Sequence, residues 1–199
     1  ISRSLVGSEM CIRDRPLGAH NWQAMSIDLE AGLAYIPTQE NPFFYAIQED
    51  YKKTGVFKWT PGQWNMGIEM SSLAQNILNN LESQPKPGGF LKAFDPLTGE
   101  TKWSVPIPHY WNGGVLGTAG GLVFQGDALG MFSAYDKETG ERLWEFNTYT
   151  SMLAPPITFE IDGEQYVSIL TGSGGGDLFG GEPLPPIEIQ ASLTLSLIH

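Results

Sequence analysis

Residues 91–103 read Leu-Lys-Ala-Phe-Asp-Pro-Leu-Thr-Gly-Glu-Thr-Lys-Trp, and residues 132–144 read Phe-Ser-Ala-Tyr-Asp-Lys-Glu-Thr-Gly-Glu-Arg-Leu-Trp. Both stretches follow the pattern Ala-aromatic-Asp-x-x-Thr-Gly-Glu-x-x-Trp, and their aspartates, Asp95 and Asp136, lie 41 residues apart. A period of about 40–45 residues built from short strands is typical of β-propellers. The repeat therefore predicts an all-β fold made of similar blades.

Each copy of the repeat is expected to form a strand, a turn and a second strand. The Asp-x-x-Thr-Gly segment suits the turn, because Asp accepts hydrogen bonds from turn amides and Gly adopts positive φ. The final tryptophan, Trp103 or Trp144, is expected to point outward and pack between neighbouring blades. A weaker copy of the pattern at residues 26–32 precedes a strand expected at 33–36.

Further strands are expected on both sides of the second copy. Residues 121–126 and 157–161 are short apolar runs of β-forming residues, and Asp162-Gly163 is a hairpin signal before the strand expected at 165–170. Residues 172–176, Gly-Ser-Gly-Gly-Gly, lack the Lys-Ser/Thr end of a phosphate-binding loop and are interpreted as a close-packed turn.

Residues 41–88 interrupt the repeat. We interpret them as a surface insert between blades, with a short helix expected over residues 72–81. Trp59 and Trp64 are expected to pack within the insert, with shaping of a substrate entrance as the alternative.

Composition excludes several classes of function. The chain has 199 residues, a net charge of −11 and 11 basic residues, which does not suit a phosphate-binding surface for nucleic acid. No run approaches the roughly 18 apolar residues of a membrane-spanning helix. The single cysteine cannot form an internal disulfide, and the Cys-x-x-Cys spacing of thiolate zinc sites and attached haem is absent from the sequence.

The two ends of the chain are predicted to be translated sequencing adapter. Residues 10–14 can be written as ATG TGT ATA AGA GAC followed by AG, and the complementary strand CTG TCT CTT ATA CAC encodes residues 195–199. One oligonucleotide thus accounts for both ends, so segments 1–15 and 195–199 are expected to form no part of the propeller packing and to be exposed, or docked weakly and arbitrarily. A natural N-terminus that matches by chance is the alternative. Residues 16–194 are then expected to be an internal piece of a longer protein.

Three motifs outside the repeat carry a resemblance to a known family. They are His20-Asn21-Trp22, Trp59-x-Pro61-Gly62-x-Trp64-Asn65-x-Gly67 and Trp111-Asn112-Gly113-Gly114. Together with the tryptophan repeat, they resemble the pyrroloquinoline-quinone (PQQ) dependent alcohol dehydrogenases over nearly all of residues 16–190. The quinohaemoprotein type is a better match than the methanol dehydrogenases.

The resemblance implies a partial eight-bladed β-propeller of four-stranded antiparallel blades with tryptophan-docking repeats. It implies that PQQ lies on the propeller axis beside a calcium ion and takes a hydride from an alcohol. A periplasmic location and a cytochrome electron acceptor are also implied, with haem c, where present, in a separate domain. In the family the calcium ligands and the catalytic Asp precede the His-Asn-Trp segment. The chain is therefore expected to supply no catalytic or metal-binding residue and to be inactive alone.

Carried over residue by residue, the resemblance predicts that Asn21, Trp22, Trp111 and Asn112 line the cofactor. Each has a structural alternative. Asn21 could instead be an Asx-turn residue where a strand begins, and Trp111 with the following Asn-Gly-Gly could serve packing and a tight turn. The alternative function is a non-enzymatic propeller scaffold that binds protein partners in the cell envelope.

Overall fold

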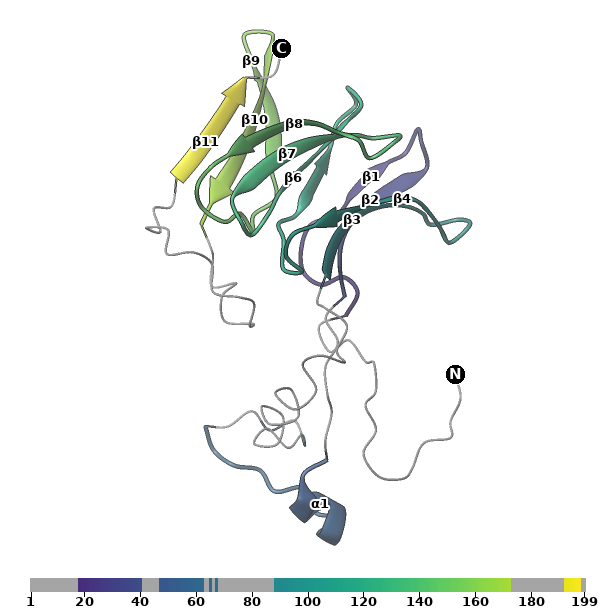
Figure 1. Cartoon of the computed structure of the whole chain (residues 1–199), viewed down its shortest axis with the longest axis vertical. Helices are drawn as coiled ribbons and strands as arrows, with labels where there is room; N and C mark the ends of the chain where they lie inside the picture. Colours follow the sequence, from purple (N-terminus) through teal and green to yellow (C-terminus); the bar gives the residue numbers. More distant parts are fainter. Residues whose placement is uncertain are drawn as a thin grey trace. The chain divides into compact units, whose positions relative to one another are not determined.

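Three antiparallel sheets dominate the computed structural model, which describes residues 18–40, 47–62, 65, 67 and 88–172 and the backbone of 192–197 (Figure 1). The first sheet has the order β1 (Ser26–Asp28), β2 (Leu33–Glu40), β3 (Gly88–Asp95) and β4 (Glu100–Ile107). The second has the order β5 (Val115–Gly117), β6 (Leu122–Gly126), β7 (Met131–Asp136) and β8 (Arg142–Asn147). The predicted fold of four-stranded antiparallel sheets is confirmed.

The chain divides into two compact units. One comprises Leu17–Glu40 and Pro87–His199 and contains all three sheets. The other comprises Ile1–Pro16 and Asn41–Lys86, and its described part contains the short helix α1 (Glu49–Thr54). The unit with the sheets holds the buried core and the candidate site.

The two repeats fold as their sequence predicts. Each one ends the third strand of its sheet, makes a turn and begins the fourth strand. Asp95 Oδ1 accepts hydrogen bonds from the backbone amides of Leu97 and Thr98, and Asp136 Oδ1 does the same for the equivalent residues of the second copy. The turn glycines have φ of 77° at Gly99 and 74° at Gly140, where a side chain would be strained.

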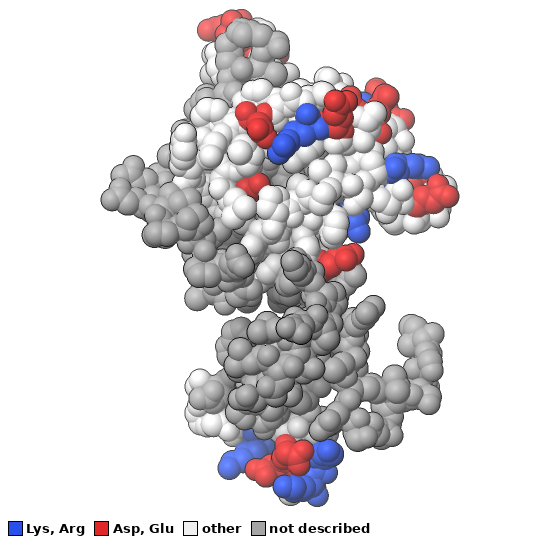
Figure 2. Space-filling view, viewed as in Figure 1, with Lys and Arg blue, Asp and Glu red and all other residues white. Residues whose placement is uncertain are grey.

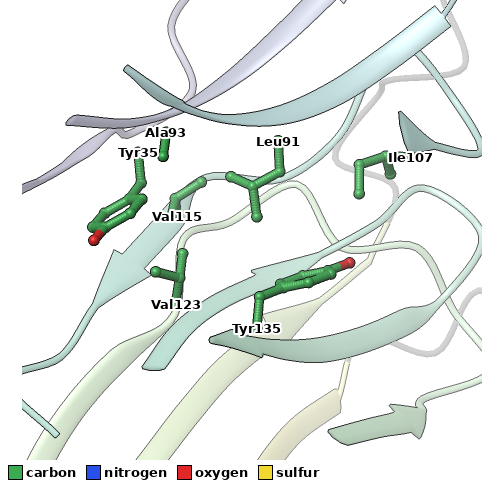
Figure 3. Close-up of a cluster of buried hydrophobic side chains, with 7 residues drawn as sticks. All are labelled: Tyr35, Leu91, Ala93, Ile107, Val115, Val123 and Tyr135. Carbon is green, nitrogen blue, oxygen red and sulfur yellow. The ribbon is translucent and has the colours of Figure 1, made fainter. Parts of the chain in front are cut away.

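A shared core joins the first and second sheets (Figure 3). Seven buried side chains form it: Tyr35, Leu91, Ala93 and Ile107 from the first sheet, and Val115, Val123 and Tyr135 from the second. Burying apolar surface of this kind stabilises a fold by about 25 cal/mol per Å². In β3 and β4 the residues that face this core alternate along the strand, as at Leu91 and Ala93, which is the period of two of an extended chain.

Trp103 and Lys137 link the two sheets at their edge. The Trp103 indole N–H donates to the Lys137 carbonyl oxygen at 3.0 Å, and its ring stacks on Tyr35 with centroids 5.8 Å apart. A methyl group on Gly140 would lie 2.8 Å from the same ring. The Lys137 ammonium also pairs with Asp28 at 2.9 Å. The turn of the second repeat therefore packs against Trp103 of the first repeat.

Trp144, the matching residue of the second repeat, has a different environment. It is 38% exposed, and all six residues of β8 are exposed. Its ring meets Phe132 edge-on at 5.8 Å and stacks with Phe146 at 6.3 Å. Among the residues that the structure describes, no turn from another repeat covers this indole in the way that Gly140 covers Trp103.

The insert lies within a blade, so the expectation that it separates two blades was wrong. Glu40 at the end of β2 pairs directly with Gly88 at the start of β3, so the two strands that flank residues 41–87 are neighbours in the same sheet. Strand pairing between distant segments is not visible in a local pattern, which explains the error. The helix expected over 72–81 lies outside the described residues. The sequence reading missed α1, which ends at Gly55 in the left-handed conformation.

The third sheet has the order β11-β10-β9, with β9 at Ile157–Ile161, β10 at Glu164–Thr171 and β11 at Ser192–Leu197. Residues 195–197 pair with Ser168, Val167 and Tyr166 of β10. An open strand edge offers unpaired backbone groups to any extended segment, whatever its origin. The adapter origin of segments 1–15 and 195–199 stays a prediction.

Charged side chains of both signs lie next to one another on the face drawn in Figure 2. Most of the described acidic residues with a shifted pKa are turn aspartates. Backbone hydrogen bonds from Thr98 and Thr139 lower the pKa of Asp95 and of Asp136, and the hydrogen bond from Lys137 lowers that of Asp28. Each of these carboxylates therefore favours the folded state while it is ionised.

We expect the stability of the protein to fall in acid. A folded-state pKa below the ordinary value of 3.8 means that each stabilising contribution is complete above that value and is lost as the pH falls through the lower, folded-state value. Melting temperatures measured between neutral pH and about pH 2 test this. Asp136→Asn keeps the Oδ1 acceptor but does not titrate, so its melting temperature is expected to fall less. An identical acid profile for this variant would contradict the assignment.

Candidate active site

Two loops of the sheet-containing unit carry the four predicted site residues. One loop precedes β1 and contains Asn21 and Trp22, and the other joins β4 to β5 and contains Trp111 and Asn112. The Trp22 and Trp111 rings meet edge-on, with centroids 6.1 Å apart and planes at 65°. The Val115 amide also donates to the Ala24 carbonyl at 2.8 Å. Residues almost 90 positions apart in the sequence thus form one aromatic pair.

The first loop is anchored to β2 and presents its tip to solvent. The His20 Nδ1 hydrogen bonds to the Pro37 carbonyl oxygen at 2.8 Å, and the Gln39 amide donates to the Ala19 carbonyl at 2.8 Å. Asn21 Oδ1 accepts the backbone amide of Trp22 at 2.9 Å, which orients the side-chain amide. Trp22 is 56% exposed. An oriented amide and an open indole face are therefore adjacent on a fixed loop.

The second loop is buried and tightly bonded. Trp111 is 4% exposed and packs with Tyr110 and Leu153. Its backbone amide donates to His109 Nδ1 at 3.0 Å. Asn112, also buried, donates from Nδ2 to the His109 carbonyl and accepts the Ala128 amide at Oδ1. Both amide atoms of Asn112 thus bond to the backbone, which makes this side chain a support of the loop.

Two glycines let the second loop approach its neighbours. A methyl group on Gly113 would lie 2.9 Å from the carbonyl oxygens of Gly126 and Met152. One on Gly114 would lie 2.8 Å from Pro155 Cβ. The Gly-Gly part of the Trp-Asn-Gly-Gly motif is therefore explained by close backbone contact with the second sheet and the segment that follows it.

Buried glutamine side chains surround the two loops, and they were not predicted from the sequence. Gln23, Gln39 and Gln125 are buried, and Gln125 Nε2 donates to the Gly113 carbonyl at 3.0 Å. Gln23 and Gln39 also line a small recess together with Pro37, Thr38, Tyr110 and Asn112. One of these amides could have been predicted from the sequence, because Gln39 occupies a position of β2 that alternation places on the inward face.

The described residues of the two loops offer aromatic rings and side-chain amides. Among the described residues, no group of three or more His, Cys, Asp and Glu side chains could hold a metal ion. Burial raises the pKa of Asp127, but its carboxylate accepts the amides of Leu129 and Met131 within its own turn. Burial likewise raises the pKa of Tyr110. The aromatic pair and the Asn21 amide suit a planar ligand that carries hydrogen-bond acceptors.

Four-stranded antiparallel sheets that share a core are typical of the blades of a β-propeller, and the Trp22–Trp111 pair lies at their loops. Residues 8–167 match the PQQ family, described as the glucose/ethanol/alcohol dehydrogenase β-propeller domain. The chain belongs to this family of oxidoreductase propellers. The matched range begins inside segment 1–15.

Curated relatives are quinohaemoprotein and related alcohol dehydrogenases. The chain is 40% identical to quinohemoprotein alcohol dehydrogenase ADH IIB of Pseudomonas putida over 171 residues, which are 85% of this chain and 23% of that protein. It is 38% identical to the 1-butanol dehydrogenase (cytochrome c) of Thauera butanivorans, covering 80% of this chain and 22% of that one.

A solved structure agrees with these relatives. The crystal structure of quinohemoprotein alcohol dehydrogenase from Comamonas testosteroni matches with a TM-score of 0.65 and 38% identity, over 79% of this chain and 23% of that one. The chain thus spans less than a quarter of the length of the relatives that it matches. No helix among the described residues is long and apolar enough to cross a membrane.

Proposed function

We propose that this chain is the C-terminal part of the propeller of a quinoprotein alcohol dehydrogenase, which oxidises alcohols to aldehydes. The family match over residues 8–167 is the observation that carries the proposal. The identity to alcohol dehydrogenases of several bacteria supports alcohols as the substrate class. Within the chain, the Trp22–Trp111 pair supports a planar aromatic cofactor.

PQQ fits part of the described site. When bound, PQQ supplies an ortho-quinone that takes up the hydride of the alcohol, next to a calcium ion that polarises it. Trp22 offers an exposed ring beside a buried one, which suits contact with a flat ring system. Asn21 offers amide N–H groups beside it, which suit a quinone oxygen. Trp111 holds Trp22 in place from the interior.

The described residues do not complete a redox site. They contain no cluster of metal-ligating side chains, and the only buried carboxylate found near the loops, that of Asp127, is engaged by its own turn. We therefore place the calcium ligands and the proton-accepting carboxylate in other parts of the propeller. The substrate alcohol, a cytochrome acceptor, haem c in a separate domain and a periplasmic location belong to the same proposal.

The proposal extends to the architecture. Trp103 is seated under the turn of the following repeat, and we propose that Trp144 is seated in the same way under a further repeat in an eight-bladed propeller. The exposure of the aromatic side chains on β8 supports this, because stacked indole and phenyl rings are normally covered in a folded protein.

A comparison of this chain with a full-length protein tests the proposal. Full-length protein reconstituted with PQQ and calcium is expected to reduce an artificial dye when a primary alcohol is added. The 199-residue chain is expected neither to bind PQQ tightly nor to reduce the dye, since it supplies one side of the site. Dye reduction by the chain alone would contradict the division of the site. A full-length protein whose dye reduction does not depend on PQQ would contradict the proposed function.

A further inference from the structure

Gly89 lies directly under the loop that carries Trp111. It lies near the start of β3, where it pairs with Gln39 of β2 on one side and with Ile107 of β4 on the other. A methyl group at this position would overlap the His109 carbonyl oxygen and the Asn112 side-chain amide, and would lie 2.9 Å from the His109 carbonyl carbon. Among the described glycines, this is the closest approach to a loop of the candidate site.

The contacts above Gly89 lead directly to Trp111. His109 accepts the backbone amide of Trp111 at Nδ1 and accepts the Asn112 amide at its carbonyl oxygen. Asn112 in turn accepts the Ala128 amide and so ties the loop to the second sheet. Any displacement of the His109 carbonyl therefore moves the group that fixes the backbone of Trp111.

We propose that Gly89 is a positioning residue for the cofactor site. Because Gly89 has no side chain, the loop from His109 to Asn112 packs directly against β3, and this packing fixes the position of the Trp111 ring relative to the Trp22 ring. The inference rests on the proposed function for its cofactor and on geometry for the rest. Gly89 does not have the positive φ that would require glycine, so the need for glycine is steric alone.

Gly89→Ala in the full-length protein is the main test, with Gly120→Ala as the matched control. Gly120 also lacks a positive φ, and the nearest atom to a methyl group there is Thr118 Oγ1 at 3.9 Å. The first readout needs no cofactor. The Trp22–Trp111 pair is expected to contribute exciton-coupled bands to the circular dichroism of the apo protein, and Gly89→Ala is expected to remove them while Gly120→Ala keeps them.

The second readout is the affinity for PQQ, followed by fluorescence quenching. In enzymes a misplacement of about 1 Å costs about 100-fold in rate, and with that scale as a guide we expect Gly89→Ala to weaken PQQ binding about 10- to 100-fold. In a Trp111→Phe background the same substitution is expected to cost much less, because residues that act through one contact are not additive. Equal losses in both backgrounds would overturn the proposal.

Asn112→Ser tests the same loop without adding atoms next to β3. It removes the Asn112 hydrogen bonds to the loop and to Ala128, and is expected to weaken PQQ binding as Gly89→Ala does, whether or not the glycine variant folds. Wild-type dichroism and PQQ affinity in either folded variant would overturn the proposal. Altered dichroism in a protein whose wild type does not bind PQQ would support the positioning role and overturn the proposed function instead.

Discussion

Trp103→Ala is expected to lower the free energy of unfolding of this chain by about 3–5 kcal/mol, the range found when large aromatic residues are truncated in a core. The indole stacks on Tyr35, lies against Gly140 and donates to the Lys137 carbonyl. Alanine would open a cavity between two sheets and leave that carbonyl with the weaker Tyr35 hydroxyl contact at 3.3 Å. Urea-induced unfolding of wild type and variant measures the loss.

Trp144→Ala is the matched control, since it occupies the same position in the second repeat. Its ring is 38% exposed in this chain, so truncation there is expected to cost clearly less than truncation of Trp103. In the full-length protein the two costs are expected to become similar, because a further repeat then covers Trp144. Similar costs already in the isolated chain would contradict this account of the repeat.

Asn21→Ala is expected to lower kcat of the full-length enzyme by about ten- to a thousand-fold, by analogy with the loss of one oxyanion donor. A hydrogen bond to a quinone oxygen gains strength as negative charge develops there during the reaction. The side chain is exposed, so the melting temperature is expected to change little. Activity is normalised to folded, PQQ-loaded protein.

Asn21→Asp separates the two roles open to this residue. Aspartate keeps the Oδ1 acceptor for the Trp22 amide but has no N–H to donate. If Asn21 acts on the cofactor, the aspartate variant loses activity as the alanine variant does. If it is a turn residue, the aspartate variant turns over normally and the alanine variant unfolds early, which would remove Asn21 from the site.

Local chemistry accounts for the parts of the fold that the sequence predicted well. The turns at Asp95 and Asp136 follow from one carboxylate and one glycine within five residues, and both appear in the structure with those hydrogen bonds. The strand that follows each turn can likewise be predicted from residues that are close to it in the sequence. The class of fold came from the spacing of these two turns, because a repeated unit must stack on its own copy.

Contacts between distant segments account for the parts that were missed. The insert looked like a spacer between blades because nothing in residues 33–40 shows that β2 pairs with β3. The approach of Trp22 to Trp111 and the interior position of Asn112 depend on how two loops meet. The resemblance supplied the motifs, but the supporting role of Asn112 required the positions of His109 and Ala128.

Because Glu40 pairs with Gly88, the segment between β2 and β3 can be replaced by another one while the two strands stay paired. The residues that flank the insert are paired with each other at the end of one ladder, so the pairing of β2 with β3 does not depend on what the intervening chain contains. Lengthening a loop between fixed ends costs little, about 0.6 kcal/mol for each doubling. Segments of different length and composition can therefore replace residues 41–87 without a change in the blade.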